Sequence, residues 1–220
     1  HLFGDPAMLI PIPNKTITIS DVSPDTLETL GIATFNGTQT EIPGFGNGYI
    51  TLIDANRSVT REYQISSETH SLSYALPGAT LFRGQFSFSG ENFSGDIRIP
   101  QDISYSTDPA RLMIYVHDNE KEAIGVMGEI QLTGGEGTND TFGPQISFET
   151  ISGQKLENGD HFSESEDLII RFSDPLGINL TNESGHEIQV TDLETGNSET
   201  ITQDFYYDQN SIITGTVTFN

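Results

Sequence analysis

The sequence predicts an all-β protein built of two consecutive β-sandwich domains, and three observations support this prediction. Apolar residues occupy alternate positions in several runs between Leu81 and Asp118, a pattern that places one side of a strand on a core and the other in water. No segment shows sustained helical periodicity, and β-branched residues are abundant. A glycine-rich stretch, Gly134–Gly137, separates two parts of the chain that each carry strands of their own.

The block between Leu81 and Asp118 is the predicted centre of the first sandwich. Its apolar residues alternate in Phe82–Phe88, in Ile97–Ile99 and in Leu112–Val116. Pro100 follows the second run and cannot donate a hydrogen bond to a neighbouring strand. We therefore expect that strand to end there or to lie at an edge of its sheet.

The remaining predicted strands are short runs rich in β-branched and aromatic residues, bounded by Gly, Pro, Asn or Asp. We expect Gly44, Gly46 and Gly48 to break the chain before the run Tyr49–Ile53. In chain order the runs are Thr16–Ile19, Leu27–Phe35, Tyr49–Ile53, Arg57–Ile65, Ala123–Leu132, Gln145–Phe148, Leu168–Phe172, His186–Thr191 and Ser211–Phe219.

These runs divide the chain into three parts. Residues 14–136 are predicted to form the first sandwich and residues 142–220 the second, with the boundary between Gly134 and Phe142. The short apolar run at Ala7–Ile12 cannot build a core of its own. Residues 1–13 are therefore interpreted as the tail of an upstream domain.

The charge and composition exclude several classes of function. Nine Lys and Arg residues stand against 32 Asp and Glu residues, which gives a formal net charge of −23. Such a field repels nucleic acid and anionic membranes. The sequence has no apolar run near the roughly 20 residues of a membrane span, so membrane insertion is not expected. It also has no cysteine, which excludes disulfides, thiolate metal sites and a cysteine nucleophile within these residues.

No catalytic residue and no cofactor-binding motif are predicted, and one candidate metal site remains. Asp118, Glu120 and Glu122 occupy alternate positions near the end of a predicted strand. Three carboxylates on one side could bind calcium, a hard cation that prefers oxygen ligands. A solvated hairpin turn explains the same pattern equally well.

Several strings, taken in order, resemble one family of bacterial proteins. Leu2–Ala7 resembles the segment that closes the catalytic domain of gingipain-like cysteine peptidases. The strings Leu81–Gly84, Phe86–Ile99, Pro100–Tyr105 and Tyr115–Asp118 resemble the β domain that follows it in the PorU-type (type IX secretion sortase) family. A further set of strings resembles the next domain of that family, which is immunoglobulin-like. These strings are Gly134–Gly135, Gly143–Pro144, Gly177–Asn179, Gly185–Ile188 and Gly215–Val217.

The resemblance implies a function for the parent protein that this chain does not itself perform. The family is implied to cleave C-terminal secretion signals and to attach cargo at the outer membrane of Bacteroidetes-type bacteria. Its catalytic His and Cys belong to a caspase-like domain upstream, and no position of this sequence matches them. The resemblance also implies that the second domain is immunoglobulin-like and would continue past Asn220, so that it is incomplete here.

Two functional hypotheses follow. The first is a non-catalytic accessory region of a secreted or cell-surface gingipain-like cysteine peptidase, located outside the cell or at the outer-membrane surface. It would support the upstream peptidase domain or bind other secretion or cell-surface proteins. The alternative is a calcium-dependent extracellular adhesin or carbohydrate-binding tandem, which the acidity and the cluster at Asp118 favour.

The incomplete second domain has a structural consequence. We expect Ser211–Phe219 to lie beside an open sheet edge whose unpaired backbone groups recruit a substitute strand. The substitute would be a neighbouring copy of the chain or the Ala7–Ile12 segment.

The acidic surface predicts a stability that depends on salt. Like charges repel in the folded state, and the Debye length falls from about 10 Å at 0.1 M salt to about 3 Å at 1 M. Moderate NaCl should therefore raise the melting temperature, and divalent ions should do so at lower concentration if they have sites. Thermal melts across a salt series measure this effect, and a melting temperature indifferent to both ions rejects it.

Overall fold

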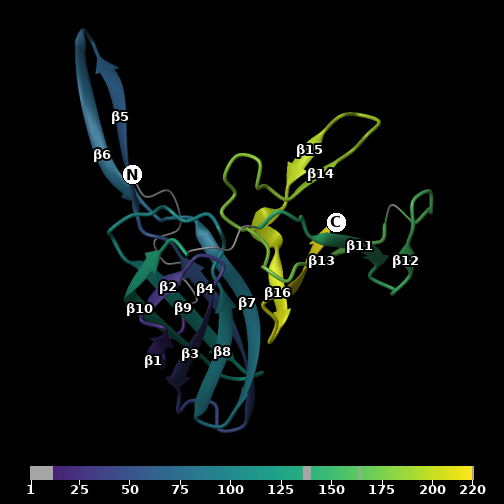
Figure 1. Ribbon diagram of the computed structural model, residues 1–220, viewed down its shortest axis with the longest axis horizontal. Coiled ribbons are helices and arrows are strands. Elements are labelled where there is room, and N and C mark those ends of the chain that lie inside the picture. Colours follow the sequence, from purple (N-terminus) through teal and green to yellow (C-terminus); the bar gives the residue numbers. More distant parts are fainter. Residues whose placement is uncertain (1–11, 136–139, 164, 220) are drawn as a thin grey trace, which may run out of the picture.

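The computed structural model describes residues 12–135, 140–163 and 165–219, whose regular secondary structure is almost entirely β-strand (Figure 1). One turn of 3-10 helix, η1 (Thr202–Asp204), is the only helical element in those ranges, and no helix among them is long and apolar enough to cross a membrane. The all-β prediction is confirmed, and the arrangement of sheets agrees with a β-sandwich. The immunoglobulin-like detail of the second half stays a prediction.

The first half of the chain forms two layers. One is an antiparallel sheet in the order β1-β3-β8, and the other is the β7-β4-β9-β10-β2 part of a ten-stranded sheet. The central block supplies β7, β8 and β9, so it contributes to both layers. The strands are β1 (Thr18–Ser23), β2 (Thr26–Glu28), β3 (Ile32–Thr38), β4 (Phe45–Ile53), β7 (Thr80–Ser89), β8 (Asn92–Arg98), β9 (Ala110–His117) and β10 (Glu122–Thr133).

Phenylalanine rings fill the space between these layers. Phe35 of β3 meets Phe86 of β7 edge-to-face with 5.2 Å between ring centroids, and Phe93 of β8 lies 5.7 Å from Phe86. Gly48 of β4 is the cross-strand partner of Phe86, and a Cβ atom built on Gly48 would lie 2.2 Å from Cζ of that ring. The ring therefore fills the volume that a side chain at this strand position would need.

This packing corrects one expectation from the sequence. Gly46 and Gly48 do not break the chain, because β4 starts at Phe45 and runs through both glycines. The rings of their cross-strand partners, Phe88 and Phe86, lie over these two glycines. The absence of a side chain at Gly46 and Gly48 therefore leaves room for the two rings within the strand.

Other differences are local. The predicted strand Leu27–Phe35 is divided into β2 and β3 by a turn in which Leu30 has φ 61° and the Gly31 N–H donates to the Glu28 carbonyl. Strands β6 (Glu68–Leu76) and β16 (Tyr206–Gln209) are absent from the sequence-based prediction. The predicted strand Arg57–Ile65 has the same bounds as β5.

The second half forms the β12-β11-β13-β17-β16 part of the same ten-stranded sheet. Its strands are β11 (Gln145–Thr150), β12 (Lys155–Leu156), β13 (Leu168–Ser173), β16 and β17 (Thr214–Phe219). Residues 174–205, which include the hairpin β14 (Gln189–Thr191) and β15 (Ser198–Thr200), pack on one face of this sheet. There Phe205 meets Phe172 edge-to-face at 5.7 Å.

The expectation of an open edge beside Ser211–Phe219 is wrong. β17 lies inside the sheet, because it pairs with β13 on one side and with β16 on the other. This strand therefore needs no substitute partner. Residues 1–11, which hold most of the predicted tail 1–13 and of the Ala7–Ile12 segment, lie outside the described residues.

The two halves meet through β16 and β7, which pair in parallel with Tyr207 opposite Gly84. The Tyr207 ring stacks on Phe82 at 4.5 Å, and one connected core cluster contains buried residues from both halves. Most of the predicted boundary falls in residues 136–139, outside the described part of the chain. The division into domains 14–136 and 142–220 stays a prediction.

The glycine packing predicts a position-specific cost. Replacing Gly48 by alanine should lower the free energy of unfolding by about 1–3 kcal/mol, because the new methyl group must displace the Phe86 ring. Gly128→Ala is the matched control, since Gly128 also lies in a strand and nothing stands within 4 Å of the place that the alanine methyl group would take. Urea unfolding of both variants measures the difference, and equal stabilities would contradict the packing argument.

Candidate functional site

A projecting two-stranded ribbon is a largely exposed feature of the described residues. Strands β5 (Arg57–Ile65) and β6 (Glu68–Leu76) pair only with each other over their whole length, and Figure 1 shows them extending away from both layers of the first half. An isolated hairpin of this kind is marginally stable in water. Something must therefore hold its base.

The base of the ribbon is fixed by the buried carboxylate of Asp54. Its Oδ1 accepts the N–H of Ala55 at 2.7 Å, and its Oδ2 accepts the N–H of Ser104 at 2.7 Å. After β6, a Cβ atom at Gly78 would lie 2.3 Å from the Ala55 carbonyl oxygen, so the segments that lead into and out of the ribbon are in close contact. The ribbon is therefore anchored at its base.

The two faces of the ribbon differ in chemistry. Cross-strand register places the larger apolar residues and the basic residues on one face, and small or polar residues on the other. Ile65 and Leu72 of the apolar face are 57% and 54% exposed. The apolar face carries Arg57, Val59, Arg61, Tyr63, Ile65, Glu68, His70, Leu72, Tyr74 and Leu76; the polar face carries Ser58, Thr60, Glu62, Gln64, Thr69, Ser71, Ser73 and Ala75.

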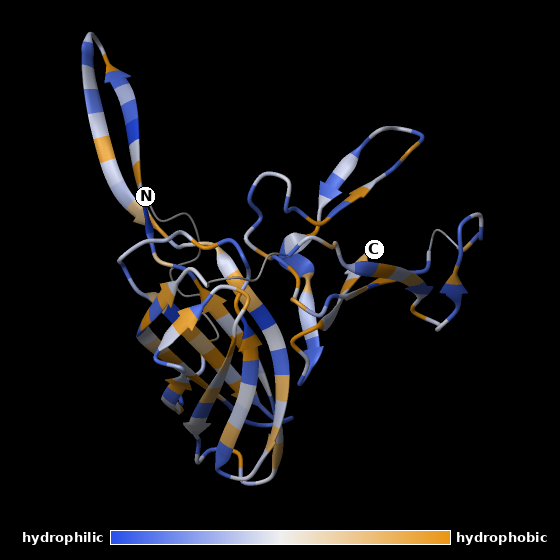
Figure 2. Cartoon of the chain, in the orientation of Figure 1, coloured by the Kyte–Doolittle hydropathy of each residue, from blue (hydrophilic) through white to orange (hydrophobic). Residues whose placement is uncertain are grey.

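The composition of the apolar face is therefore typical of a protein-contact surface. Figure 2 shows the alternation of hydrophilic and hydrophobic bands along the ribbon. An exposed row of apolar and aromatic residues flanked by arginine is typical of interface centres. Two of the nine basic residues of this acidic chain, Arg57 and Arg61, lie on this face.

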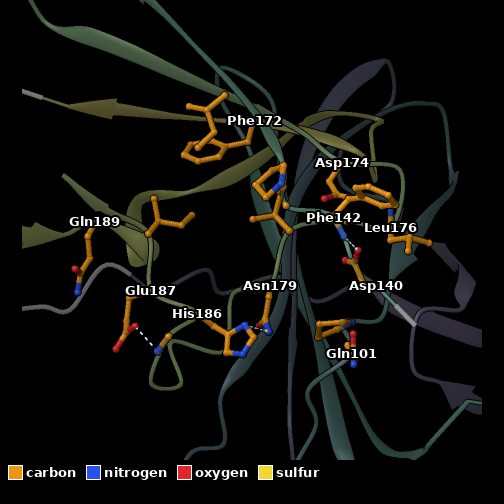
Figure 3. A pocket seen from close by; sticks show the side chains of 18 of the residues that line it. Gln101, Asp140, Phe142, Phe172, Asp174, Leu176, Asn179, His186, Glu187 and Gln189 are labelled. Atoms are coloured by element: carbon orange, nitrogen blue, oxygen red, sulfur yellow. Dashed lines mark hydrogen bonds between the residues drawn. The ribbon is translucent and has the colours of Figure 1, made fainter. Parts of the chain in front are cut away.

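A second candidate is a pocket of about 840 Å³ on the covered face of the second half's sheet (Figure 3). Its walls combine apolar side chains with polar ones that lie around the pocket, as in many ligand pockets. The group formed by Asp102, Asn179, His186 and Glu187 is called its polar end. The apolar walls come from β11, β13 and the covering segment, and include Ile146, Phe148, Ile170, Phe172, Leu176, Ile178, Ile188, Val190 and Ile201.

The polar end of the pocket joins residues from the two halves. Asp102 Oδ2 accepts a hydrogen bond from Asn179 Nδ2 at 2.7 Å and lies 3.3 Å from Nε2 of His186. Asn179 Nδ2 also lies 3.2 Å from His186 Nδ1, and Glu187 accepts the Gly185 N–H. An Asp–His pair of this kind can orient a base.

The predicted calcium residues lie in the turn between β9 and β10. Asp118 Oδ1 accepts the backbone N–H groups of Glu120 and Lys121, each at 2.7 Å, and these bonds hold the pKa of Asp118 below its usual value. Glu122 accepts the phenol of Tyr115 at 2.7 Å, a bond that raises the pKa of Tyr115 to about 12. Both carboxylates therefore have internal partners.

In the described ranges, no three His, Asp or Glu side chains are grouped so that they could hold a metal ion. Calcium binding at Asp118, Glu120 and Glu122 stays a prediction. Sequence reasoning missed both the ribbon face and the pocket. The ribbon could have been found from the alternation in Glu68–Leu76, whereas the pocket depends on long-range packing.

The described residues form a β-sandwich protein with an exposed ribbon and a pocket lined by apolar and polar side chains. Among solved structures, the chain is similar to dimeric latent PorU from Porphyromonas gingivalis, with a TM-score of 0.53 and 20% sequence identity. The similarity covers 98% of this chain and 22% of PorU, so the chain spans about a fifth of that protein. No protein-family model and no curated protein matches the sequence.

The acidic turn gives a direct test of calcium. If Asp118, Glu120 and Glu122 bind calcium, millimolar CaCl2 should raise the melting temperature of the wild type above the effect of MgCl2 at equal concentration. The gain should disappear in Glu120→Gln, whose side chain is exposed, and persist in the control Glu62→Gln on the ribbon. Equal shifts with both ions in all three proteins would contradict a specific site.

Proposed function

We propose that this chain is a non-catalytic accessory β-sandwich region of a secreted or cell-surface gingipain-like cysteine peptidase of the PorU type. Its place is the extracellular or outer-membrane surface of a bacterium. It supports the peptidase domain upstream and contacts partner proteins, and the parent's catalytic residues lie outside this chain.

The observation that carries the proposal is the structural similarity to PorU over 98% of the chain. At 20% identity that similarity concerns the fold. The ordered strings in the sequence, from Leu2–Ala7 through Gly215–Val217, add an independent link to the same family. The lack of any cysteine agrees with a region that leaves a cysteine peptidase's chemistry to another domain.

The ribbon is the proposed contact with a partner. Tyr63, Ile65 and Leu72 are exposed on its apolar face, and burying such side chains is worth about 25 cal/mol per Å² of apolar area. The similar PorU structure is described as dimeric, so a second copy of the parent protein is the first partner to test.

The test compares ribbon variants of the parent protein, or of this chain if it self-associates. Replacing Tyr63 and Leu72 by threonine should weaken association at least about tenfold, as expected for aromatic and aliphatic anchors of an interface. The same change should leave the melting temperature of the monomer nearly unaltered, because both side chains are exposed. Analytical ultracentrifugation over a concentration series measures the association.

Changes on the polar face provide the matched control. Glu62→Gln with Ser71→Ala alters the cross-strand partners on the opposite side of the same ribbon and should leave association unchanged. Equal effects of both double variants would remove the ribbon face from the proposal. Thiol-dependent cleavage of Arg-, Lys- or signal-bearing peptides by this chain alone would overturn the non-catalytic assignment.

A further inference from the structure

The apolar face of the second half's sheet is covered at its centre and open at its edge. Register places Ile146 opposite Phe172 and Phe148 opposite Ile170, so all four side chains point to the same face. Ile170 and Phe172 are buried beneath residues 174–205, whereas Ile146 and Phe148 of β11 are 52% and 44% exposed. The pocket of about 840 Å³ lies along this transition.

The outer side of β11 also has backbone positions without a neighbouring strand. β12 is only two residues long and pairs with Phe148 and Glu149. In the pairing of the described strands, Gln145–Ser147 has β13 on one side and no strand on the other. An edge of this kind can pair with an added strand.

The lining of the pocket is acidic. Its acidic side chains are Asp102, Asp140, Asp174 and Glu187, and neither Lys nor Arg lines it. One histidine, His186, also lines it, with its Nε2 atom 3.3 Å from Asp102 Oδ2. Asp174 is buried and accepts the Leu176 N–H at 2.8 Å, but Asp102, Asp140 and Glu187 are only partly buried. The pocket therefore favours a cationic group over an anionic one.

We propose that this pocket binds an extended peptide segment of another protein by β-strand addition. The segment pairs with the free edge at Gln145–Ser147 and places an apolar side chain beside Ile146. An arginine or lysine of the segment lies near Asp102 and Glu187 at the polar end. This site is separate from the ribbon and goes beyond the accessory function proposed above.

The observations select this occupant over others. A small apolar molecule would fill the pocket without using the free backbone edge or the carboxylates. In strand addition, main-chain hydrogen bonds supply affinity and pockets for alternate side chains supply specificity, and both elements are present here. The volume of about 840 Å³ is near the upper end of ligand pockets, which suits several side chains better than one small ligand.

The experiment uses the full chain and a labelled probe peptide. The probe is an acetylated and amidated peptide in which eight residues alternate between valine and threonine and one further arginine stands at each end. With an arginine at both ends, the peptide can pair with β11 in either the parallel or the antiparallel direction. Fluorescence anisotropy should show saturable binding. A peptide with contiguous valines, one with N-methylated backbone amides and one with glutamate in place of arginine should each bind at least about tenfold more weakly.

Protein variants locate the site. Ile146→Lys should weaken binding at least about tenfold, because it places a charge on the apolar contact. Glu187→Gln should weaken it about threefold, as expected for one partly exposed charge pair. Val126→Lys is the matched control, because Val126 is a β-branched strand residue that is 60% exposed on β10 and does not line the pocket. Circular dichroism melts verify that each variant folds.

Three results would overturn the proposal. The first is an absence of binding at about 1 mM probe, below which affinity carries little biological weight. The second is equal binding of the probe and its shuffled or N-methylated versions, which would indicate a nonspecific apolar surface. The third is self-association of the chain that Ile146→Lys abolishes without any peptide binding, which would place a second copy in the pocket.

Discussion

The parallel pairing of β16 with β7, completed by the Tyr207 side chain, is the interaction on which the rest of the structure depends. Tyr207 stacks on Phe82, and its hydroxyl donates to the Ile178 carbonyl at 3.1 Å and accepts the Ile178 N–H. Burial raises the pKa of the Tyr207 phenol, so the hydroxyl stays neutral and can both donate and accept a hydrogen bond. Without the hydroxyl, a buried N–H and a buried carbonyl would lose their partner, at a cost of about 1–3 kcal/mol for each group left unsatisfied.

This anchor also sets the position of the chain next to the pocket. Gly177 has φ +89°, and a Cβ atom there would lie 2.7 Å from Cγ of Arg98 and 2.9 Å from the Tyr207 hydroxyl, so only glycine fits. Arg98 spans the junction by donating to the carbonyls of Leu30 at 2.9 Å and Pro175 at 3.0 Å. Asn179 lies two residues after Gly177, and its side chain donates a hydrogen bond to Asp102 of the first half. The polar end of the pocket is thus a consequence of how the two halves are joined.

The parts of the fold that could be predicted are those decided by local pattern. The apolar residues Leu112, Ile114 and Val116 recur at every second position and lie in β9, and Arg57–Ile65 is a strand with the predicted bounds. The wrong predictions occur where the local structure depends on residues that are distant in sequence. Gly46 and Gly48 lie in a strand because Phe88 and Phe86 fill their side-chain volumes, and those rings are about 40 residues away in sequence. Tyr206–Gln209 is too short and too polar to signal a strand, yet it joins the halves because β7 and β17 lie on either side of it.

The same reasoning explains why the candidate site was not visible in the sequence. Asp102, Asn179 and His186 form no motif, because Asp102 reaches the other two only through the junction. The acidic turn at Asp118 was visible because its carboxylates are adjacent in sequence. Its hydrogen bonds to backbone N–H groups show that such a pattern can serve the turn itself.

Two other sheet edges, at β2 and β1, carry features that disfavour an added strand. The far edge of the ten-stranded sheet is β2, which is three residues long and ends in Glu28, and short charged edges resist added strands. In the small sheet, β1 is interrupted by a bulge between Ile19 and Asp21, which also disfavours an added strand. At Gln145–Ser147 the ladder is open, β12 protects only the neighbouring positions, and Ile146 points its side chain into a pocket. An edge that combines free backbone groups, an exposed apolar row and an acidic lining is therefore better explained by a complementary strand than by solvent.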